Sequence, residues 1–209
     1  LNGILTEQAN GWYYKHNLGG GNFEHAKLIT PKPSFAGLGG QLQLADLDAD
    51  GGKQLVMYDT EPKGYFELSD ENNWQSFKNF ETLPNINLRD PNLRMIDLNG
   101  DGIVDVLITE ENVFTWYESE GRKGINNIHK TYKSIDEEKG PHIVFADQEQ
   151  CIFLTDMNGD GLTDIARIRN GEICYWPNLG YGKFGAKVSM DNAPLFDHPD
   201  SFNPMYIRL

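Results

Sequence analysis

The chain has 209 residues, 39% of them hydrophobic and 11% aromatic, which is the composition of a folded globular protein and argues against disorder. Its formal net charge of -13 disfavours nucleic acid and anionic membrane surfaces as partners, and no apolar run approaches the ~20 residues of a membrane-spanning helix. Because the chain starts at Leu1 without an initiator Met or a signal peptide, we expect an excised piece of a longer, soluble protein.

The opening segment, residues 1–41, predicts part of a repeat unit. An Asn10-Gly11 turn precedes an aromatic strand at 12–14, as in a β-hairpin. The pattern Asn-Leu-Gly-x-Gly-x-Phe at 17–23 returns near the other end of the chain, at 178–184. This recurrence indicates that the chain enters partway through a repeated structural unit.

Three longer units follow, at about residues 42–92, 93–151 and 152–206. Each opens with apolar residues two apart, as a strand with one buried face requires, passes through a nine-residue acidic loop and returns in a second apolar run. A third, aromatic strand is expected at 65–68, 113–117 and 173–176. The leading aspartates of the loops, Asp46, Asp97 and Asp156, are 51 and 59 residues apart, which suits one four-stranded propeller blade per unit.

Two segments depart from this regularity. Residues 118–150 are longer and more polar than their counterparts, so we expect an expanded, solvated loop there, with a partner-binding protrusion as the alternative. Ile207 and Leu209 predict the start of another unit at 207–209. Residues 1–209 are therefore expected to form a single all-β propeller fragment, either an open arc of a larger propeller or a closed four-bladed ring.

The second and third acidic loops, residues 97–105 and 156–164, carry oxygen-bearing side chains at positions one, three, five and nine. A glycine after position five permits a sharp turn, and the backbone carbonyl of position seven can add an oxygen. This donor set favours calcium over zinc, which prefers Cys and His, and over magnesium, which retains its waters. The predicted ligands are Asp97, Asn99, Asp101, Ile103 and Asp105, and then Asp156, Asn158, Asp160, Leu162 and Asp164.

The first acidic loop, residues 46–54, has Asp46, Asp48 and Asp50 at positions one, three and five, but Gln54 replaces the last carboxylate. We expect weaker calcium binding there, or none. An EF-hand is excluded because it needs a Glu at position twelve, where the loops have Met57, Ile108 and Arg167. The alternative for all three loops is that Asp, Asn and Gly simply form turns.

The acidic loops and their flanking strands resemble the calcium-binding FG-GAP or VCBS blade repeats of integrin α-chain propellers and bacterial surface proteins. Segments 156–167, 170–184 and 191–197 more narrowly resemble the propeller region of the B component of bacterial Tc insecticidal toxins, which is shared with the Salmonella virulence plasmid protein B. The resemblance implies a secreted, extracellular module without catalytic activity. It would dock on the A-type pore-forming subunit and, with the C-type subunit, gate the release of an enclosed toxic enzyme.

The main alternative function is a carbohydrate-binding or cell-surface adhesion propeller. It would use exposed aromatic residues to stack on sugars, whereas we expect most of them to fill the space between blades. The residues concerned are Trp12, Tyr13, Tyr14, Trp116, Tyr117, Tyr175 and Trp176.

An enzyme is the third option. The sequence has no nucleophile elbow, phosphate loop, HExxH motif or dinucleotide fingerprint, so we expect no catalysis, and only a carboxylate pair for glycoside hydrolysis stays open. Cys151 and Cys174 have no metal-site spacing and are expected to be buried free thiols. Exposed strand edges allow an edge-to-edge homodimer.

Overall fold

The computed structural model describes residues 3–8, 11–30, 42–59, 61–69, 73–147, 151–198 and 201–209. They belong to two compact units: unit 1 is Leu1–Leu88 with Glu120–Ile125, and unit 2 is Arg89–Ser119 with Asn126–Leu209. In the described residues the regular structure is β-sheet, apart from two short 3-10 turns, η1 at Gly121–Lys123 and η2 at Pro204–Tyr206. The all-β prediction is confirmed.

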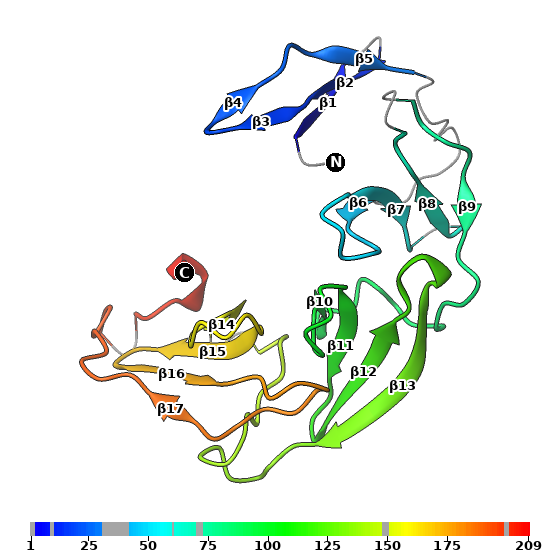
Figure 1. Ribbon diagram of the computed structural model, residues 1–209. Helices are drawn as coiled ribbons and strands as arrows, with labels where there is room; N and C mark the ends of the chain where they lie inside the picture. Colours follow the sequence, from blue (N-terminus) through cyan, green and yellow to red (C-terminus); the bar gives the residue numbers. More distant parts are fainter. Residues whose placement is uncertain are drawn as a thin grey trace. The chain divides into compact units, whose positions relative to one another are not determined.

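Unit 1 contains two blade-like sheets. Blade 1 has three strands in the order β1-β2-β5, with β3 and β4 paired as a separate hairpin, and blade 2 has four in the order β6-β7-β8-β9 (Figure 1). The strands are β1 Ile4–Gln8, β2 Gly11–Lys15, β3 Asn17–Gly19, β4 Asn22–Phe23, β5 Lys27–Ile29, β6 Leu42–Ala45, β7 Gln54–Met57, β8 Gly64–Phe66 and β9 Lys78–Asn79.

Unit 2 contains blade 3, in the order β10-β11-β12-β13, and blade 4, in the order β14-β15-β16-β17. Each blade runs through the sheet in chain order, as hairpin-connected propeller blades do. The strands are β10 Leu93–Ile96, β11 Asp105–Thr109, β12 Val113–Ser119, β13 Ile125–Tyr132, β14 Cys151–Thr155, β15 Asp164–Arg169, β16 Glu172–Trp176 and β17 Val188–Ser189.

The predicted order of strand, acidic loop, strand and aromatic strand is confirmed in blades 2, 3 and 4. The recurring Asn-to-Phe motif also closes in the same way at both sites, with Asn17 opposite Phe23 and Asn178 opposite Phe184. The Asn10 of the predicted opening turn lies outside the described residues.

Two other predictions need correction. The expanded loop at 118–150 is wrong for its first half, because that part completes β12 and forms β13, whose polar sequence suits an outer strand. Residues 207–209, predicted to begin a strand, lie outside regular secondary structure here.

Aromatic and aliphatic side chains between neighbouring sheets form the core of each unit. Leu107 and Trp116 of blade 3 pack with Ile165 and Trp176 of blade 4, whereas Trp12 of blade 1 packs with Leu55 of blade 2. The second strand of each four-stranded blade is largely buried on both faces, so β7 and β11 have apolar runs instead of alternating sequences, whereas in β15 the run is interrupted by the buried Arg167.

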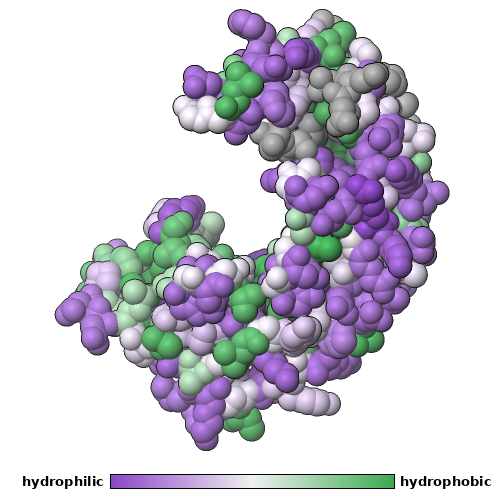
Figure 2. Space-filling view, viewed as in Figure 1, coloured by the Kyte–Doolittle hydropathy of each residue, from purple (hydrophilic) through white to green (hydrophobic). Residues whose placement is uncertain are grey.

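The aromatic residues follow the expected preference for the core. Trp12, Tyr14, Trp116 and Trp176 are buried, and Tyr13, Tyr117 and Tyr175 are partly buried. Both cysteines are free and buried, as predicted. The face shown in Figure 2 is mainly hydrophilic, with hydrophobic residues in smaller groups.

No helix in the described residues has the length and apolarity needed to cross a membrane.

Replacing Gly182 by alanine should destabilise unit 2 through its core. Gly182 has a φ of +67°, and a Cβ there would lie 2.5 Å from Nε1 of Trp116, a side chain only 2% exposed. Gly180 is the matched control, because its φ is +83° but a Cβ would meet nothing within 4 Å. Both changes carry about 1–2 kcal/mol of left-handed strain, and overpacking adds about 1–3 kcal/mol at Gly182 alone. If the two variants lose the same free energy of unfolding in urea, the close packing of Gly182 against Trp116 is contradicted.

Candidate functional site

The three acidic loops join the first two strands of blades 2, 3 and 4, as the sequence predicted. Position one directly follows the first strand in each case. Position nine is the first residue of the second strand, so Gln54, Asp105 and Asp164 are part of the sheet. The predicted ligands of each loop thus belong to one hairpin loop, and in the second and third loops the last of them is the first residue of a blade strand.

The second acidic loop folds back on its own backbone. Asp97 accepts hydrogen bonds from the backbone N–H groups of Gly100 and Gly102, at 2.7 and 2.8 Å. The side chains at positions three and five meet, because Nδ2 of Asn99 donates to Oδ2 of Asp101 at 3.0 Å. Position five also accepts from the backbone N–H of Ile103. The oxygens of positions one, three and five therefore stay within the loop.

The third acidic loop repeats this pattern. Asp156 accepts from Gly159 and Gly161 at 2.7 and 2.9 Å, and Nδ2 of Asn158 donates to Asp160 at 2.8 Å. The backbone hydrogen bonds hold the pKa of the Asp156 carboxyl below its usual value, and the bond from Gly161 has the largest effect. The same short motif thus produces the same loop twice, in two different blades.

Left-handed residues at positions four and six make these turns possible. Gly102 and Gly161, at position six, have φ values of +84° and +89°, as the motif led us to expect. Position four is left-handed too, which the sequence analysis missed: it is glycine in the second and third loops but Ala49, with φ of +56°, in the first. An alanine in this conformation costs about 1–2 kcal/mol.

The ninth position has a structural role that the sequence analysis also missed. Asp105 is fully buried and accepts from the backbone N–H groups of Leu98, at 3.1 Å, and Ser119, at 2.8 Å. It therefore ties its loop to the end of β12. Burial raises the pKa of the Asp105 carboxyl to about 6, and the charges of Asp101 and Asp97 contribute to this rise.

Asp164 does the same in blade 4. It is fully buried and accepts from the backbone N–H groups of Met157, at 2.9 Å, and Asn178, at 2.8 Å. In the first loop, Oε1 of Gln54 accepts from Leu47 at 2.9 Å. A neutral amide oxygen therefore keeps the bond to position two without supplying a carboxylate.

The donor chemistry of the second and third acidic loops fits calcium. Each carries carboxylate and amide oxygens that accept backbone N–H groups of the same loop. An oxygen of this kind can accept an N–H and still bind a cation, because it has two lone pairs. The described residues contain no group of three or more His, Cys, Asp or Glu side chains arranged for a metal ion. Calcium binding by these loops therefore stays a prediction.

Arg167, at position twelve counted from Asp156, anchors the long segment after β13. It is 1% exposed, pairs with Glu137 at 2.9 Å and lies over the ring of Trp176. Lys187 pairs with the adjacent Glu138 at 3.1 Å. The expectation of a solvated loop is therefore corrected: this part of the segment is held on blade 4 by ion pairs.

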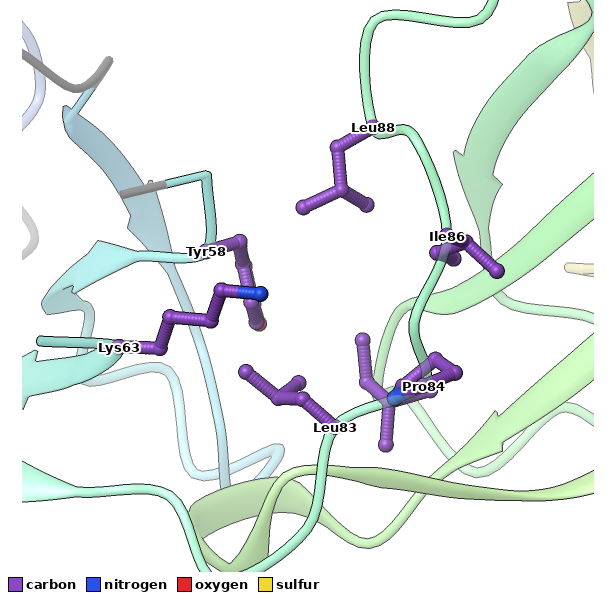
Figure 3. Close-up of a pocket in the computed structure, with 7 residues that line it drawn as sticks. Tyr58, Lys63, Leu83, Pro84, Ile86 and Leu88 are labelled. Carbon is purple, nitrogen blue, oxygen red and sulfur yellow. The ribbon is translucent and has the colours of Figure 1, made fainter. Parts of the chain in front are cut away.

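A small apolar pocket in unit 1 is too small for a ligand. Tyr58 and Lys63 face Leu83, Pro84, Ile86 and Leu88 across it (Figure 3). Its volume of about 10 Å³ is room for no more than one water molecule. Burial raises the pKa of Tyr58 to about 12, so this phenol stays neutral. We interpret the pocket as a packing gap.

Among known proteins, similarity is found in structure and not in sequence. No protein-family model and no curated protein matches the chain. A chain of the Photorhabdus luminescens Tc holotoxin pore aligns with a TM-score of 0.74 and 23% identity, over 97% of this chain and 9% of its own length. A lectin of Agrocybe aegerita that recognises non-reducing terminal N-acetylglucosamine aligns with a TM-score of 0.55 and 18% identity, over 85% of this chain and 46% of its own.

A TcdB2–TccC3 structure also aligns over 94% of this chain, but its TM-score of 0.42 is too low to support an argument. At identities below 25%, the two stronger likenesses show the fold alone. The chain spans less than half the length of either of those proteins. The fold is therefore a propeller-type arrangement of blades, also found in part of a Tc toxin assembly.

Asp164→Ala should destabilise the metal-free chain far more than Asp160→Ala. The first change leaves the buried N–H of Asn178 without an acceptor, at a cost of about 1–3 kcal/mol, and also the partly buried N–H of Met157. Asp160, in contrast, is exposed and accepts one backbone bond, from Leu162. Urea unfolding in excess chelator measures this difference without any contribution from calcium. If the two variants lose similar amounts of unfolding free energy, the structural role of position nine is contradicted.

Proposed function

We propose that the chain is a non-catalytic, calcium-stabilised propeller module of a secreted bacterial toxin-complex B component. It would dock an A-type pore-forming subunit and, with the C-type subunit, take part in assembly and gating of the toxin. The observation that carries the proposal is the likeness in fold, over 97% of the chain, to part of a Tc holotoxin pore. The resemblance noted for segments 156–167, 170–184 and 191–197 agrees with the same assignment.

The proposed role of calcium is structural. Asp97, Asn99, Asp101, Asp105 and the Ile103 carbonyl would hold one ion, and Asp156, Asn158, Asp160, Asp164 and the Leu162 carbonyl another. Calcium would supply positive charge between carboxylates that otherwise repel one another. In the described residues no Lys or Arg forms an ion pair with Asp97, Asp101, Asp156 or Asp160. Their charge is therefore available to a cation.

Protein docking is favoured over sugar binding by the placement of the aromatic residues. Trp12, Tyr14, Trp116 and Trp176 lie in the cores of the units, where they are unavailable for stacking on a sugar. The net charge of -13 also favours a partner with a basic surface.

A carbohydrate-binding module is the second candidate, because the fold also resembles a lectin. A groove of about 280 Å³ in unit 2 offers one place for a sugar, since it is lined by Phe114, Tyr132, Lys133 and Ser134. Tyr132 is 83% exposed and can present a ring face to a ligand.

Calorimetry on the metal-stripped chain should detect calcium sites in the second and third acidic loops. Asp101→Ala should remove one site and Asp160→Ala the other, and Asp191→Ala, an exposed aspartate outside the loops, should remove neither. Chelation should lower the Tm, because each occupied site adds about 2.7 kcal/mol when calcium is at a hundredfold excess over its Kd. An unchanged melting curve after complete chelation would refute the calcium role.

Binding assays should separate the two candidate functions. We expect the immobilised chain to bind an A-type toxin subunit, more weakly after chelation, and not to bind glycans ending in N-acetylglucosamine. If the chain binds these glycans, loses that binding in Tyr132→Ala and does not bind the A-type subunit, then carbohydrate recognition and not protein docking is its function. Tyr206→Ala is the matched control, because this tyrosine is equally exposed but lies away from the groove.

A further inference from the structure

We infer that the carboxylate at position three of the first acidic loop is held by the guanidinium group of Arg122 and not by a metal ion. Arg122 belongs to the η1 turn of unit 1, 74 residues after Asp48 in the sequence. Its Nη2 atom lies 2.6 Å from Oδ2 of Asp48, the side chain at position three of the loop. The carboxylate that a cation would need is therefore already paired within the chain.

A second carboxylate strengthens this arrangement. The same Nη2 atom lies 2.7 Å from Oε1 of Glu67, whose side chain is only 11% exposed, and Glu67 also pairs with Lys78. Arginine suits such a position because its guanidinium keeps its charge and offers several donors in a fixed plane. Asp48 and Glu67, which would repel each other, are thus bridged by one cation.

The turn that carries Arg122 is itself fixed in place. The backbone carbonyl of Lys123 accepts from the N–H groups of Glu81 and Thr82, at 2.8 and 3.1 Å, and the N–H of Ile125 donates to Thr82 at 3.0 Å. Gly124 leaves no room for a side chain, because a Cβ there would lie 2.0 Å from the Thr82 carbonyl oxygen. The guanidinium group is therefore presented to the loop by a held backbone.

The ninth position agrees with this inference. Gln54 keeps the backbone bond to Leu47 but adds no negative charge, unlike Asp105 and Asp164. The other two loops differ at position three as well, where they have the neutral side chains Asn99 and Asn158. A loop that lacks the ninth carboxylate and has its third position paired with arginine does not fit the calcium ligand set.

The Arg122 site is open to water on one side. Asp50, Gln54, Glu67 and Arg122 line a polar groove of about 450 Å³. Its ion pairs should therefore be weakened by salt, whereas bonds to a tightly held calcium ion would resist it. The contrast between the first loop and the two loops that would bind calcium rests on the proposed function. The contact between Arg122 and Asp48 does not depend on that proposal.

Hydrogen exchange followed by mass spectrometry tests the inference on the whole chain. Adding calcium should slow exchange at residues 98–104 and 157–163 and leave residues 47–53 unchanged. Slower exchange at 47–53 on addition of calcium would overturn the inference. If calcium slows none of the three loops, the calcium proposal fails, and the Arg122 variant alone decides the inference.

Arg122→Gln should speed exchange at residues 48–51 by about two- to fivefold, the range expected for a partly exposed ion pair. Lys123→Gln is the matched control: it lies in the same turn, removes the same charge and takes part in no ion pair among the described residues. Exchange in β2 and β7 serves as the internal check that unit 1 is folded in the variant. Equal exchange at 48–51 in the two variants would refute the role of Arg122.

Discussion

A buried oxygen acceptor at the start of the second strand closes each acidic loop. In blades 3 and 4 the acceptor is a carboxylate, Asp105 or Asp164, which accepts a hydrogen bond from the backbone N–H of position two of the loop. Each carboxylate accepts a second one, in blade 3 from the last residue of the third strand and in blade 4 from a residue just after that strand. In blade 2 the amide of Gln54 accepts the bond from position two. Without such an acceptor, backbone N–H groups would be buried unpaired, at a cost of about 1–3 kcal/mol each. The loop geometry thus depends on an acceptor that belongs to a blade strand, and the loop geometry in turn sets the positions of the exposed aspartates.

The blades depend in turn on burial between sheets. A single sheet of this kind cannot cover both of its faces, and the cores of units 1 and 2 each combine side chains from two blades. Trp116 and Trp176 fill that space in unit 2 and so are not surface ligand residues. The ion pairs of Arg167 with Glu137 and of Lys187 with Glu138 then attach the segment after β13 to blade 4. The same burial that builds the fold thereby limits which surfaces remain for partners.

The chain deals with the charge of its acidic loops in two ways. In the first loop, an arginine from elsewhere in unit 1 pairs with the position-three carboxylate. In the second and third loops, the exposed aspartates have no such cation among the described residues, which is the basis for proposing calcium. A module with one metal-independent loop and two metal-dependent loops would keep part of its structure when calcium is scarce.

The sequence by itself determined the first three strands of blades 2, 3 and 4, the positions of the acidic loops and the glycine at position six, because these depend on local periodicity and on backbone conformations that few residues adopt. It did not reveal β13, because an outer strand needs only one partner strand and carries a polar sequence. Only the tertiary structure decided that Asp105 and Asp164 are buried acceptors, that Arg122 pairs with Asp48, and that Arg167 holds Glu137. The two ion pairs join residues 74 and 30 apart in the sequence, and the burial of the two aspartates depends on the packing of whole blades, so no local pattern of residue types contains them.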